Sequence, residues 1–370
     1  MESTRILMLF TILNRGGAET MVMNYYRHID PTKVQFDFVV HREERGAYED
    51  EIEQLGGRIY RMMPLRPWTI PPYKRQICQF FDEHPEYRII HGHCSELGYF
   101  FYKEASKRGV PVIIAHAHNS RADYDMKWPW RTWLKYRMRP YLTHRFTCGE
   151  EAAVWLFGKQ GAKAVILQRN AIDAKAFQFD EAARVQKRKE LGIKENTLVI
   201  GHIGRFERQK NHSFAIKIFQ CFHAKHPDST LLLIGSGGDR EPAIRKLVAD
   251  MHLEQFVAFL GSRNDIPQLL CAMDLFLFPS LMEGLPLSLL EAQCSGLPCL
   301  ISDGVPQEAC MTDLTTRLSL HNNKVEDWAK AIIKQYAIHR DRSVYASQVA
   351  AAGYDVEQNA QWLQKFYLSL

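Results

Sequence analysis

The segment Pro279–Gly304 carries two glutamates with seven residues between them, in the sequence MEGLPLSLLEAQ. Glu283 precedes a Gly-Leu-Pro turn, and Glu291 lies in the apolar stretch Leu287–Cys294, which predicts a helix of about two turns ended by the following Gly and Pro. Because this helix lacks a polar face, we expect it to be buried, and a buried carboxylate requires a partner. That partner is either a protein group, such as a backbone N–H or an Arg, or a ligand with adjacent hydroxyls, such as a ribose.

Two cations follow a predicted strand in the second half of the chain. Thr197–Ile203 predicts that strand, which leads through Gly204 and Arg205 to Lys210 and then into a helix. Arg205 offers a planar fork of donors and Lys210 a point charge, a combination that suits the two phosphates of a diphosphate. The alternative is a basic loop that is simply solvated.

A glycine turn also joins the first predicted strand to the first predicted helix. Gly16 and Gly17 separate the strand at Thr4–Leu13 from the helix at Thr20–His28. Glycines at this position let backbone N–H groups approach an anion at a helix N-terminus. The sequence does not match GxGxxG, so the motif predicts proximity to a phosphate or sugar, or a tight connection without a ligand, rather than dinucleotide binding.

Two further loops follow predicted strands. Ser229–Ile234 ends in Gly235-Ser-Gly237-Gly, and the strand Val257–Leu260 is followed by a loop that contains Arg263. In open parallel sheets, ligands bind beyond the carboxyl ends of the strands. We therefore expect a base or a ribose to lie beside these two loops.

Histidine pairs end two other strands. His91 and His93 close one strand, and His116 and His118 close another. The spacing of each pair places both imidazoles on one side of an extended chain, which makes metal binding conceivable. No third ligand at a fixed spacing accompanies either pair, so no metal site is expected. A strand-end histidine that contacts a substrate, or that packs in a cleft between the domains, explains the same placement.

The elements that must position these residues alternate between strands and helices, as in a doubly wound α/β sheet. The chain has 370 residues, 46% hydrophobic and 24% charged. This length exceeds one ordinary core and fits two domains of roughly 150–200 residues each. We place the first domain at residues 1–168, with a last amphipathic helix at about 355–370, and the second at residues 169–354.

Composition excludes several classes of protein. No apolar run reaches the roughly 20 residues that span a bilayer, and Glu2 precedes a short strand rather than a signal-peptide core. The eight cysteines form no CxxC pair, so neither disulfides nor structural zinc are expected. A cytoplasmic location follows as an expectation.

The positive charge is concentrated in residues 121–145, whose net charge of +5 equals that of the whole chain. The cations are interleaved with Trp128, Trp130, Trp133, Tyr136 and Tyr141, a composition typical of segments at anionic membrane surfaces. The segment therefore suggests peripheral contact with the inner face of the cell membrane. The alternative is a surface helix whose aromatic rings pack inward. Nucleic acid is not an expected partner, because no nucleic-acid-binding module surrounds the segment, and its Asp123-Tyr-Asp125 triplet is interpreted as incidental.

Taken in order, these motifs resemble glycosyltransferase family 4. The resemblance covers most of the chain, and its most specific element is the pair of glutamates in PSLMEGLPLSLLEA, with Arg205 and Lys210 placed upstream. It implies the GT-B fold, in which two Rossmann-like domains face each other across a cleft and the C-terminal helix crosses back to the N-terminal domain. It also implies a retaining, metal-independent hexosyltransferase that uses a nucleotide-diphosphate sugar and no other cofactor.

The same resemblance implies roles for individual residues. Glu291 would hold the donor ribose, and Arg205 and Lys210 would bind the diphosphate. The donor sugar would be held by Glu283 and by the backbone of the four residues that follow: Gly284, Leu285, Pro286 and Leu287. The other residues expected at the donor lie in strand-end loops: Gly16, Gly17, Gly204, Gly235, Gly237 and Arg263.

His118 would touch the transferred sugar. The sequence departs from the family here, because Asn119 stands where an Asp is usual, and this leaves the choice between His116 and His118 open. Ala171 is a second departure, in a place where the family usually has Pro-Asn-Gly.

The expected function is therefore transfer of a hexosyl group to a saccharide or lipid-linked saccharide in cell-surface polysaccharide synthesis, by front-face attack with the leaving phosphate accepting the proton. Alternatives are a sugar-nucleotide epimerase of the same fold and a non-catalytic scaffold at the membrane. A nicotinamide-dependent oxidoreductase is disfavoured, because Gly235-Ser-Gly237-Gly lacks the third Gly of the dinucleotide fingerprint.

Overall fold

The computed structural model describes residues 3–118, 128–338 and 340–370. The chain divides into two compact units, with unit 1 formed by residues 1–171 and 356–370 and unit 2 by residues 172–355. No helix in the described part of the chain is both long and apolar enough to cross a membrane.

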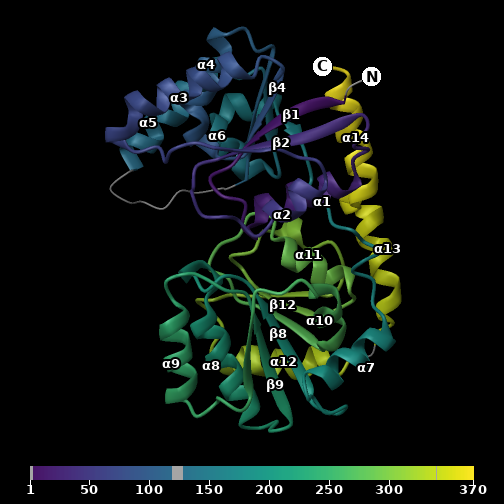
Figure 1. The fold of residues 1–370 in the computed structure, drawn as a ribbon. Helices are drawn as coiled ribbons and strands as arrows, with labels where there is room; N and C mark the ends of the chain where they lie inside the picture. Colours follow the sequence, from purple (N-terminus) through teal and green to yellow (C-terminus); the bar gives the residue numbers. More distant parts are fainter. Residues whose placement is uncertain (1–2, 119–127, 339) are drawn as a thin grey trace. The chain divides into compact units, whose positions relative to one another are not determined.

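Unit 1 is a parallel sheet with helices on both faces (Figure 1). Its strands are β1 (Thr4–Leu9), β2 (Val34–Val40), β3 (Ile59–Arg61), β4 (Ile89–Gly92), β5 (Val112–Ala117), β6 (His144–Thr147) and β7 (Ile166–Leu167). Its helices are α1 (Gly17–His28), α2 (Glu49–Gln54), α3 (Ile70–Glu83), α4 (Tyr99–Lys107), α5 (Trp128–Met138), α6 (Glu150–Gly161) and α14 (Val356–Leu368). The strand order is β3-β2-β1-β4-β5-β6-β7.

The sequence forms this sheet because its central strands are apolar on both faces, as parallel strands must be when helices cover them. All seven residues of β2 are buried, including Asp37, whose carboxylate accepts hydrogen bonds from Arg5 Nε at 2.5 Å and Tyr87 Oη at 2.6 Å. β1 ends at Leu9, four residues earlier than the predicted strand, although Phe10 and Leu13 are also buried. Because these apolar residues are buried in the loop after the strand, the apolar run in the sequence is longer than the strand itself.

Different helices cover the two faces of the unit 1 sheet. One face packs on α3, α4, α5 and α6, through residues such as Tyr73, Phe101 and Leu156. On the other face, α14 lies beside α1 and reaches the sheet, where the Tyr367 ring meets Phe36 edge to face at 6.0 Å between centroids. The C-terminal helix therefore belongs to the core of unit 1.

Unit 2 repeats the plan with a second parallel sheet. Its strands are β8 (Leu198–Ile203), β9 (Ser229–Ile234), β10 (Val257–Gly261), β11 (Leu275–Phe278), β12 (Cys299–Ser302) and β13 (Thr315–Leu318). Its helices are α7 (Glu181–Glu190), α8 (His212–His223), α9 (Glu241–Asp250), α10 (Ile266–Ala272), α11 (Leu287–Cys294), α12 (Val325–Tyr336) and α13 (Tyr345–Val349). The strand order is β10-β9-β8-β11-β12-β13.

Each sheet has one point at which the strand order reverses. In unit 1, β1 lies beside β4, and in unit 2, β8 lies beside β11. The connections from these neighbouring strands leave toward opposite sides and open a crevice at the carboxyl edge, which is where ligands of doubly wound folds bind. The motifs that follow β8 and β11 therefore carry the candidate site of unit 2.

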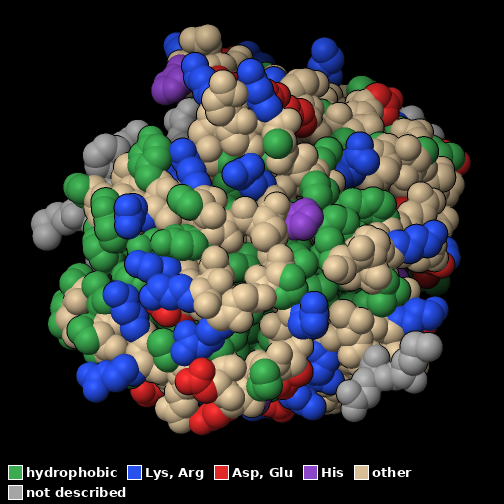
Figure 2. All heavy atoms as spheres, turned by 90° about the horizontal axis from the view of Figure 1, so that it is seen from above, with side chains coloured by type: hydrophobic (Ala, Val, Ile, Leu, Met, Phe, Trp, Pro, Cys, Tyr) green, Lys and Arg blue, Asp and Glu red, His purple; other side chains and the backbone are tan. Residues whose placement is uncertain are grey.

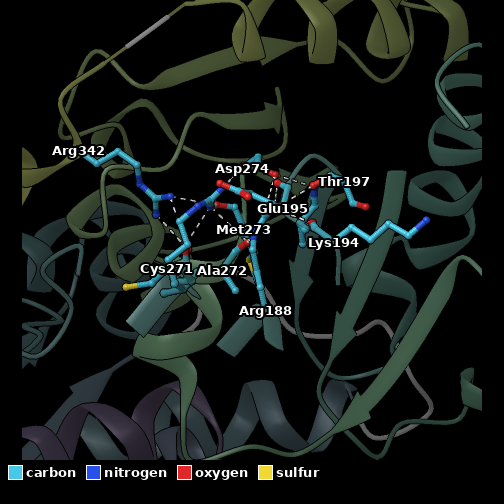
Figure 3. A network of polar contacts seen from close by, with 12 residues as sticks. Arg188, Lys194, Glu195, Thr197, Cys271, Ala272, Met273, Asp274 and Arg342 are labelled. Carbon is cyan, nitrogen blue, oxygen red and sulfur yellow. Dashed lines mark hydrogen bonds and ion pairs between the residues drawn. The ribbon is translucent and has the colours of Figure 1, made fainter. Parts of the chain in front are cut away.

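A buried ionic network fixes the start of β11. Asp274 precedes β11, and its two carboxylate oxygens accept hydrogen bonds from Arg184 Nη2 and Arg188 Nη2 of α7, each at 2.6 Å. One of these oxygens also accepts a bond from the Val199 amide at 2.7 Å. Figure 3 shows Arg188 and Arg342 approaching this region from different segments. The network ties α7 to two neighbouring strands, β8 and β11.

Arg342 completes the network by donating hydrogen bonds to the backbone carbonyls of Leu270 at 3.0 Å and Met273 at 2.9 Å, at the end of α10. The Leu270 carbonyl also accepts a bond from the Met273 amide at 3.3 Å, so the guanidinium reinforces this end of the helix and complements the negative end of its dipole. Burial lowers the pKa of Arg342 to about 10, which leaves it charged at neutral pH.

Replacing Asp274 with Asn should strongly destabilise unit 2. Arg188 is buried, so the variant leaves a guanidinium charge without its counter-ion, a change that typically costs about 3–5 kcal/mol. Urea unfolding monitored by circular dichroism measures the loss. The matched control is Asp250→Asn, which breaks the exposed Lys246–Asp250 pair on α9 and should cost less than about 1 kcal/mol. Equal effects of the two substitutions would contradict the structural role given to Asp274.

Candidate functional site

Three loops are joined side by side at the carboxyl edge of the unit 2 sheet. The Gly204 amide donates to the Ile234 carbonyl, the Gly235 amide to the Gly261 carbonyl and the Phe206 amide to the Gly237 carbonyl, each at 2.9 Å. These bonds connect the residues that follow β8, β9 and β10. The predicted glycines of this edge therefore lie in one continuous surface of backbone.

Gly235 is required by close packing at this edge. Its φ is +137°, and an added Cβ would lie 2.2 Å from the Gly204 carbonyl oxygen. Gly238, which sequence analysis did not single out as a site residue, is as constrained, since a Cβ there would lie 2.3 Å from the Phe206 carbonyl oxygen. Both glycines let the loops after β8 and β9 approach each other, whether or not a ligand is bound.

An ion pair connects the loops that follow β8 and β11. Lys210 Nζ donates to Glu283 Oε1 at 2.8 Å, and the side chains are 18% and 6% exposed. The Lys210 ammonium also lies 4.8 Å from the centre of the Phe278 ring, the last residue of β11. These two sequence-predicted residues therefore meet at the point where the strand order reverses.

Residues that sequence reasoning missed hold this pair in place. Gln209 Nε2 donates to the Met282 carbonyl at 2.8 Å and to Glu283 Oε2 at 3.3 Å. Asn211 adopts a left-handed conformation with φ of 55°, and its side-chain amide donates to the Pro279 carbonyl at 3.0 Å. The position of Asn211 directly before a helix was an available signal, because Asn tolerates this conformation and satisfies local backbone groups.

Gly304 contributes from the end of β12. Its carbonyl accepts the Glu283 amide at 3.0 Å, and a Cβ at Gly304 would lie 2.4 Å from the Leu281 carbonyl oxygen. The loop that carries Glu283 is therefore held from both sides, by the loop after β8 and by the loop after β12.

The two predicted arginines are less enclosed than Lys210. The Arg205 side chain is 60% exposed and pairs with Glu207 at 3.0 Å. Arg263 is 37% exposed and makes two hydrogen bonds to Asp265, at 2.8 and 2.6 Å. Both belong to the same edge of unit 2 as Lys210.

Glu291 lies in α11, a helix buried at seven of its eight positions. Burial raises the pKa of its carboxyl group from about 4.5 to about 7. Within the described residues, no hydrogen bond or ion pair reaches the Glu291 side chain. Among the residues that the structure describes, neither a backbone N–H nor an arginine, the protein partners considered from the sequence, bonds this carboxyl group.

The backbone from Gly284 to Leu287 forms the turn into α11. Pro286 is the residue before the helix, and its carbonyl accepts bonds from the Leu289 and Leu290 amides at 3.2 and 3.3 Å. The amides of Leu287 and of the following Ser lie in the first turn, before the first of these bonds, and point toward the start of the helix. Amides in that position bind anions or other acceptors readily.

Gly16, Gly17 and His118 belong to unit 1. Gly16 precedes α1 as its N-cap, and a Cβ there would lie 2.3 Å from Glu19 Oε2. Gly17 has open space within 4 Å of the position of its missing Cβ. His118 follows β5 directly, and burial lowers its pKa to about 3, so its imidazole is neutral at physiological pH.

The two histidine pairs of unit 1 lie together at the ends of neighbouring strands, β4 and β5. His93 Nδ1 and His118 Nε2 are 2.8 Å apart, and the His116 and His118 rings stack at 4.1 Å between centroids. His91 stacks on His93 at 4.4 Å. Sequence analysis treated the pairs separately, whereas the parallel pairing of β4 with β5 makes them one cluster.

Apart from Gly16, Gly17 and His118, the candidate site residues lie in unit 2. There the structure brings Gly204, Lys210, Gly235 and Glu283 to one edge of the sheet. Asn119 and the Asp123-Tyr-Asp125 triplet lie outside the described residues. Ala171, the second departure from the family pattern, is fully buried, and its carbonyl accepts a hydrogen bond from Asn24 at 3.1 Å.

Two family models match the chain, one in each half. Residues 16–166 match the model described as glycosyl transferase 4-like domain, and residues 183–348 match the model described as glycosyl transferases group 1. The second match contains every candidate site residue of unit 2.

Similar proteins cover nearly the whole chain. EpsF of Bacillus subtilis, which carries the name of a glycosyltransferase, is 35% identical over 98% of this chain and 96% of its own. The UDP-Gal:alpha-D-GlcNAc-diphosphoundecaprenol alpha-1,3-galactosyltransferase of Escherichia coli is 26% identical over 81% of this chain and 80% of its own. HepE of Anabaena, solved with UDP and glucose, has a TM-score of 0.80 at 19% identity, over 99% of both chains. This last likeness concerns the fold.

The buried carboxyl group of Glu291 should make stability depend on pH. The native state keeps this proton up to about pH 7, whereas the unfolded state loses it near pH 4.5, so the stabilising contribution is complete below pH 4.5 and is lost as the pH rises through 7. Between pH 4.5 and 7.5, the unfolding free energy of the wild type should fall by about 3 kcal/mol relative to that of Glu291→Gln. Parallel pH profiles from urea titration would show that Glu291 is ionised at an ordinary pKa.

Proposed function

This chain belongs to glycosyltransferase family 4, and on that premise we propose that it transfers a hexosyl group, with retention of configuration, from a nucleotide-diphosphate sugar to a saccharide or lipid-linked saccharide. Synthesis of a cell-surface polysaccharide is the proposed setting. The observation that carries the proposal is the Lys210–Glu283 pair, enclosed at the reversal point of the unit 2 sheet and next to the glycine loops.

Lys210 is placed to bind the donor diphosphate. Its side chain is 18% exposed, and among the described residues its ammonium has one carboxylate partner, so two of its three donors remain for phosphate oxygens. Arg205, exposed and on the same loop, supplies a second cation that can turn toward the diphosphate. Together they neutralise the charge that develops on the leaving group, a role for which no metal ion is needed in this proposal.

Glu283 and Glu291 are the proposed acceptors for donor hydroxyls. Glu283 is fixed by Lys210, Gln209 and its own amide, so its carboxylate is oriented before the sugar arrives. Glu291 binds the ribose, whose two hydroxyls supply the hydrogen bonds that a buried carboxylate requires. Donation from those hydroxyls favours the ionised form and lowers the pKa of Glu291 in the complex.

His118 contacts the transferred sugar as a neutral hydrogen-bonding group. Burial lowers its pKa to about 3, so it cannot act as a cationic acid at neutral pH. We therefore assign no proton transfer to it. The acceptor hydroxyl attacks from the face that the diphosphate leaves, and the departing phosphate oxygen takes its proton.

The names of the relatives suggest which donor and acceptor to test first. HepE was solved with UDP and with UDP-glucose, and the Escherichia coli relative is named for a UDP-galactose donor and a diphosphoundecaprenol-linked acceptor. These names support a uridine diphosphate sugar as the first donor to test and a polyprenyl-diphosphate-linked saccharide as the first acceptor.

A lipid-linked acceptor fits peripheral contact with the membrane through α5. This helix buries Leu134 and Met138 but leaves Trp133 and Tyr136 exposed by 45% and 58%. The exposed rings lie among cations, with the Arg139 guanidinium 4.4 Å from the centre of the Tyr136 ring. Figure 2 shows basic and hydrophobic side chains intermixed on one face, with acidic groups mainly toward its edges. Such a surface suits the headgroup region of an anionic bilayer.

A panel of nucleotide sugars tests the function. We expect one uridine diphosphate sugar to raise the melting temperature and to be hydrolysed slowly without acceptor, releasing UDP. Adding a polyprenyl-diphosphate saccharide should accelerate UDP release and yield a retained linkage by NMR. Conversion of the donor to an epimer without acceptor would establish the alternative function, and stabilisation by no member of the panel would overturn the proposal.

Alanine at Lys210 or Arg205 should lower kcat more than donor affinity. Each variant removes a preorganised cation at the leaving diphosphate, which usually costs roughly 10²–10³ in rate. Steady-state kinetics and calorimetric donor binding separate the two effects. Lys246→Ala on α9, 75% exposed, is the matched control and should keep wild-type turnover. Near-normal kcat in either site variant would remove that cation from the mechanism.

Tyr136→Ser should weaken binding to vesicles that contain anionic lipid, because the variant removes an aromatic ring exposed among cations. Co-sedimentation with vesicles of phosphatidylglycerol and phosphatidylcholine measures the effect. Tyr336→Ser removes a similarly exposed ring from α12 of unit 2, and its binding should equal that of the wild type. Equal sedimentation of all three proteins would argue against α5 as the membrane contact.

A further inference from the structure

The four histidines at the ends of β4 and β5 form a cluster that the proposed transfer reaction uses only in part. His91, His93 and His116 are buried, and one ring nitrogen of each lies within 4.8 Å of the others. Among the described residues, these three histidines are the set of potential metal ligands whose ligand atoms lie close enough together to share one ion. The two pairs thus supply the third ligand whose absence argued against metal binding when each pair was considered alone.

In the His91 and His93 rings, one nitrogen has a hydrogen-bond partner and the second nitrogen has none among the described residues. His91 Nδ1 lies 2.6 Å from Tyr367 Oη, and His93 Nδ1 lies 2.8 Å from His118 Nε2. Nε2 of both rings, and both nitrogens of His116, are buried without a hydrogen-bond partner among the described residues. Since buried polar atoms are nearly always paired, four unpaired ring nitrogens in one cluster need an explanation.

The pattern is that of imidazoles that bind a metal. A metal-binding histidine almost always donates its second ring N–H to a neighbouring acceptor, which fixes the tautomer and the ring orientation. Tyr367 Oη and His118 Nε2 are placed to accept from the Nδ1–H groups, which leaves Nε2 of His91 and His93 as lone-pair donors.

We propose that His91, His93 and His116 bind a divalent transition-metal ion of the zinc class, with Tyr367 and His118 as the partners that orient His91 and His93. Three neutral imidazoles are a common ligand set for Zn²⁺ and leave a fourth position open. The three proposed ligands lie within unit 1 and take no part in the proposed sugar transfer, whereas His118, which orients His93, is used by both proposals.

Binding requires a small rearrangement of the side chains. The His91 and His116 rings are nearly parallel, with 17° between their planes and 5.3 Å between centroids. A tetrahedral zinc site needs ring nitrogens about 3.4 Å apart, with their lone pairs directed to one point. Binding therefore requires the rings to rotate about their side-chain bonds, and Zn²⁺ has no d-electron preference that resists an imperfect geometry.

Cobalt(II) titration of the full-length chain, freed of metal by a chelator, tests the site. We expect one equivalent of Co²⁺ to produce the intense visible absorption of a tetrahedral centre and Zn²⁺ to displace it. His116→Gln and His91→Gln should each abolish the bands. Tyr367→Phe, which keeps all three ligands, should weaken Co²⁺ binding about 10-fold.

His41→Gln is the matched control. His41 is also in unit 1, but its two ring nitrogens already contact the Phe10 carbonyl at 2.8 Å and Tyr73 Oη at 2.7 Å. This variant should bind Co²⁺ like the wild type. Weak octahedral-type absorption without saturation at one equivalent, or saturable binding that survives both cluster substitutions, would overturn the proposal. The wild-type spectrum decides the question even if a cluster variant fails to fold.

Discussion

The ion pair between Lys210 and Glu283 is the interaction on which the candidate site depends. It joins the loops of the two strands, β8 and β11, at which the sheet order of unit 2 reverses. An enclosed carboxylate without a cation would be costly, and an enclosed ammonium without a carboxylate equally so. Each residue therefore fixes the other, and a single contact positions both the cation proposed to bind phosphate and the carboxylate proposed to bind the sugar. Gln209 and Gly304 hold the same loop from its two sides.

The two units use the same sheet plan for different chemistry. At the carboxyl edge of unit 2, cations and carboxylates are ready for phosphates and hydroxyls. At the corresponding edge of unit 1, the polar groups are four imidazoles that burial keeps neutral. Neutral imidazole can accept or donate a hydrogen bond or bind a metal ion, whereas it cannot stabilise a negative leaving group. Because of this difference in charge, we assign the proposed neutralisation of the diphosphate to unit 2.

Much of this architecture could be predicted from the sequence, because strong local signals carried it. Apolar runs predicted β9 and β11, and the apolar faces of α11 predicted its burial with Glu291. The two-residue strand β7 and the strand β6, with sequence HRFT, lacked such a signal and escaped prediction. The histidine cluster and the contacts of Gln209 could not be foreseen, since they depend on which strands are neighbours. Pairing between distant segments leaves no trace in local periodicity.

Hydrogen exchange with and without UDP tests the central claim most directly, because it reports which backbone amides a nucleoside diphosphate protects. The account predicts slower exchange in peptides that cover residues 204–210, 235–238 and 283–291, with no change in α9 or α12. These segments form the carboxyl edge of one sheet, so they should respond together at a UDP concentration that saturates binding. Saturable UDP binding that leaves all three segments unchanged, or protects α9 or α12 instead, would contradict the assignment of this edge as the donor site.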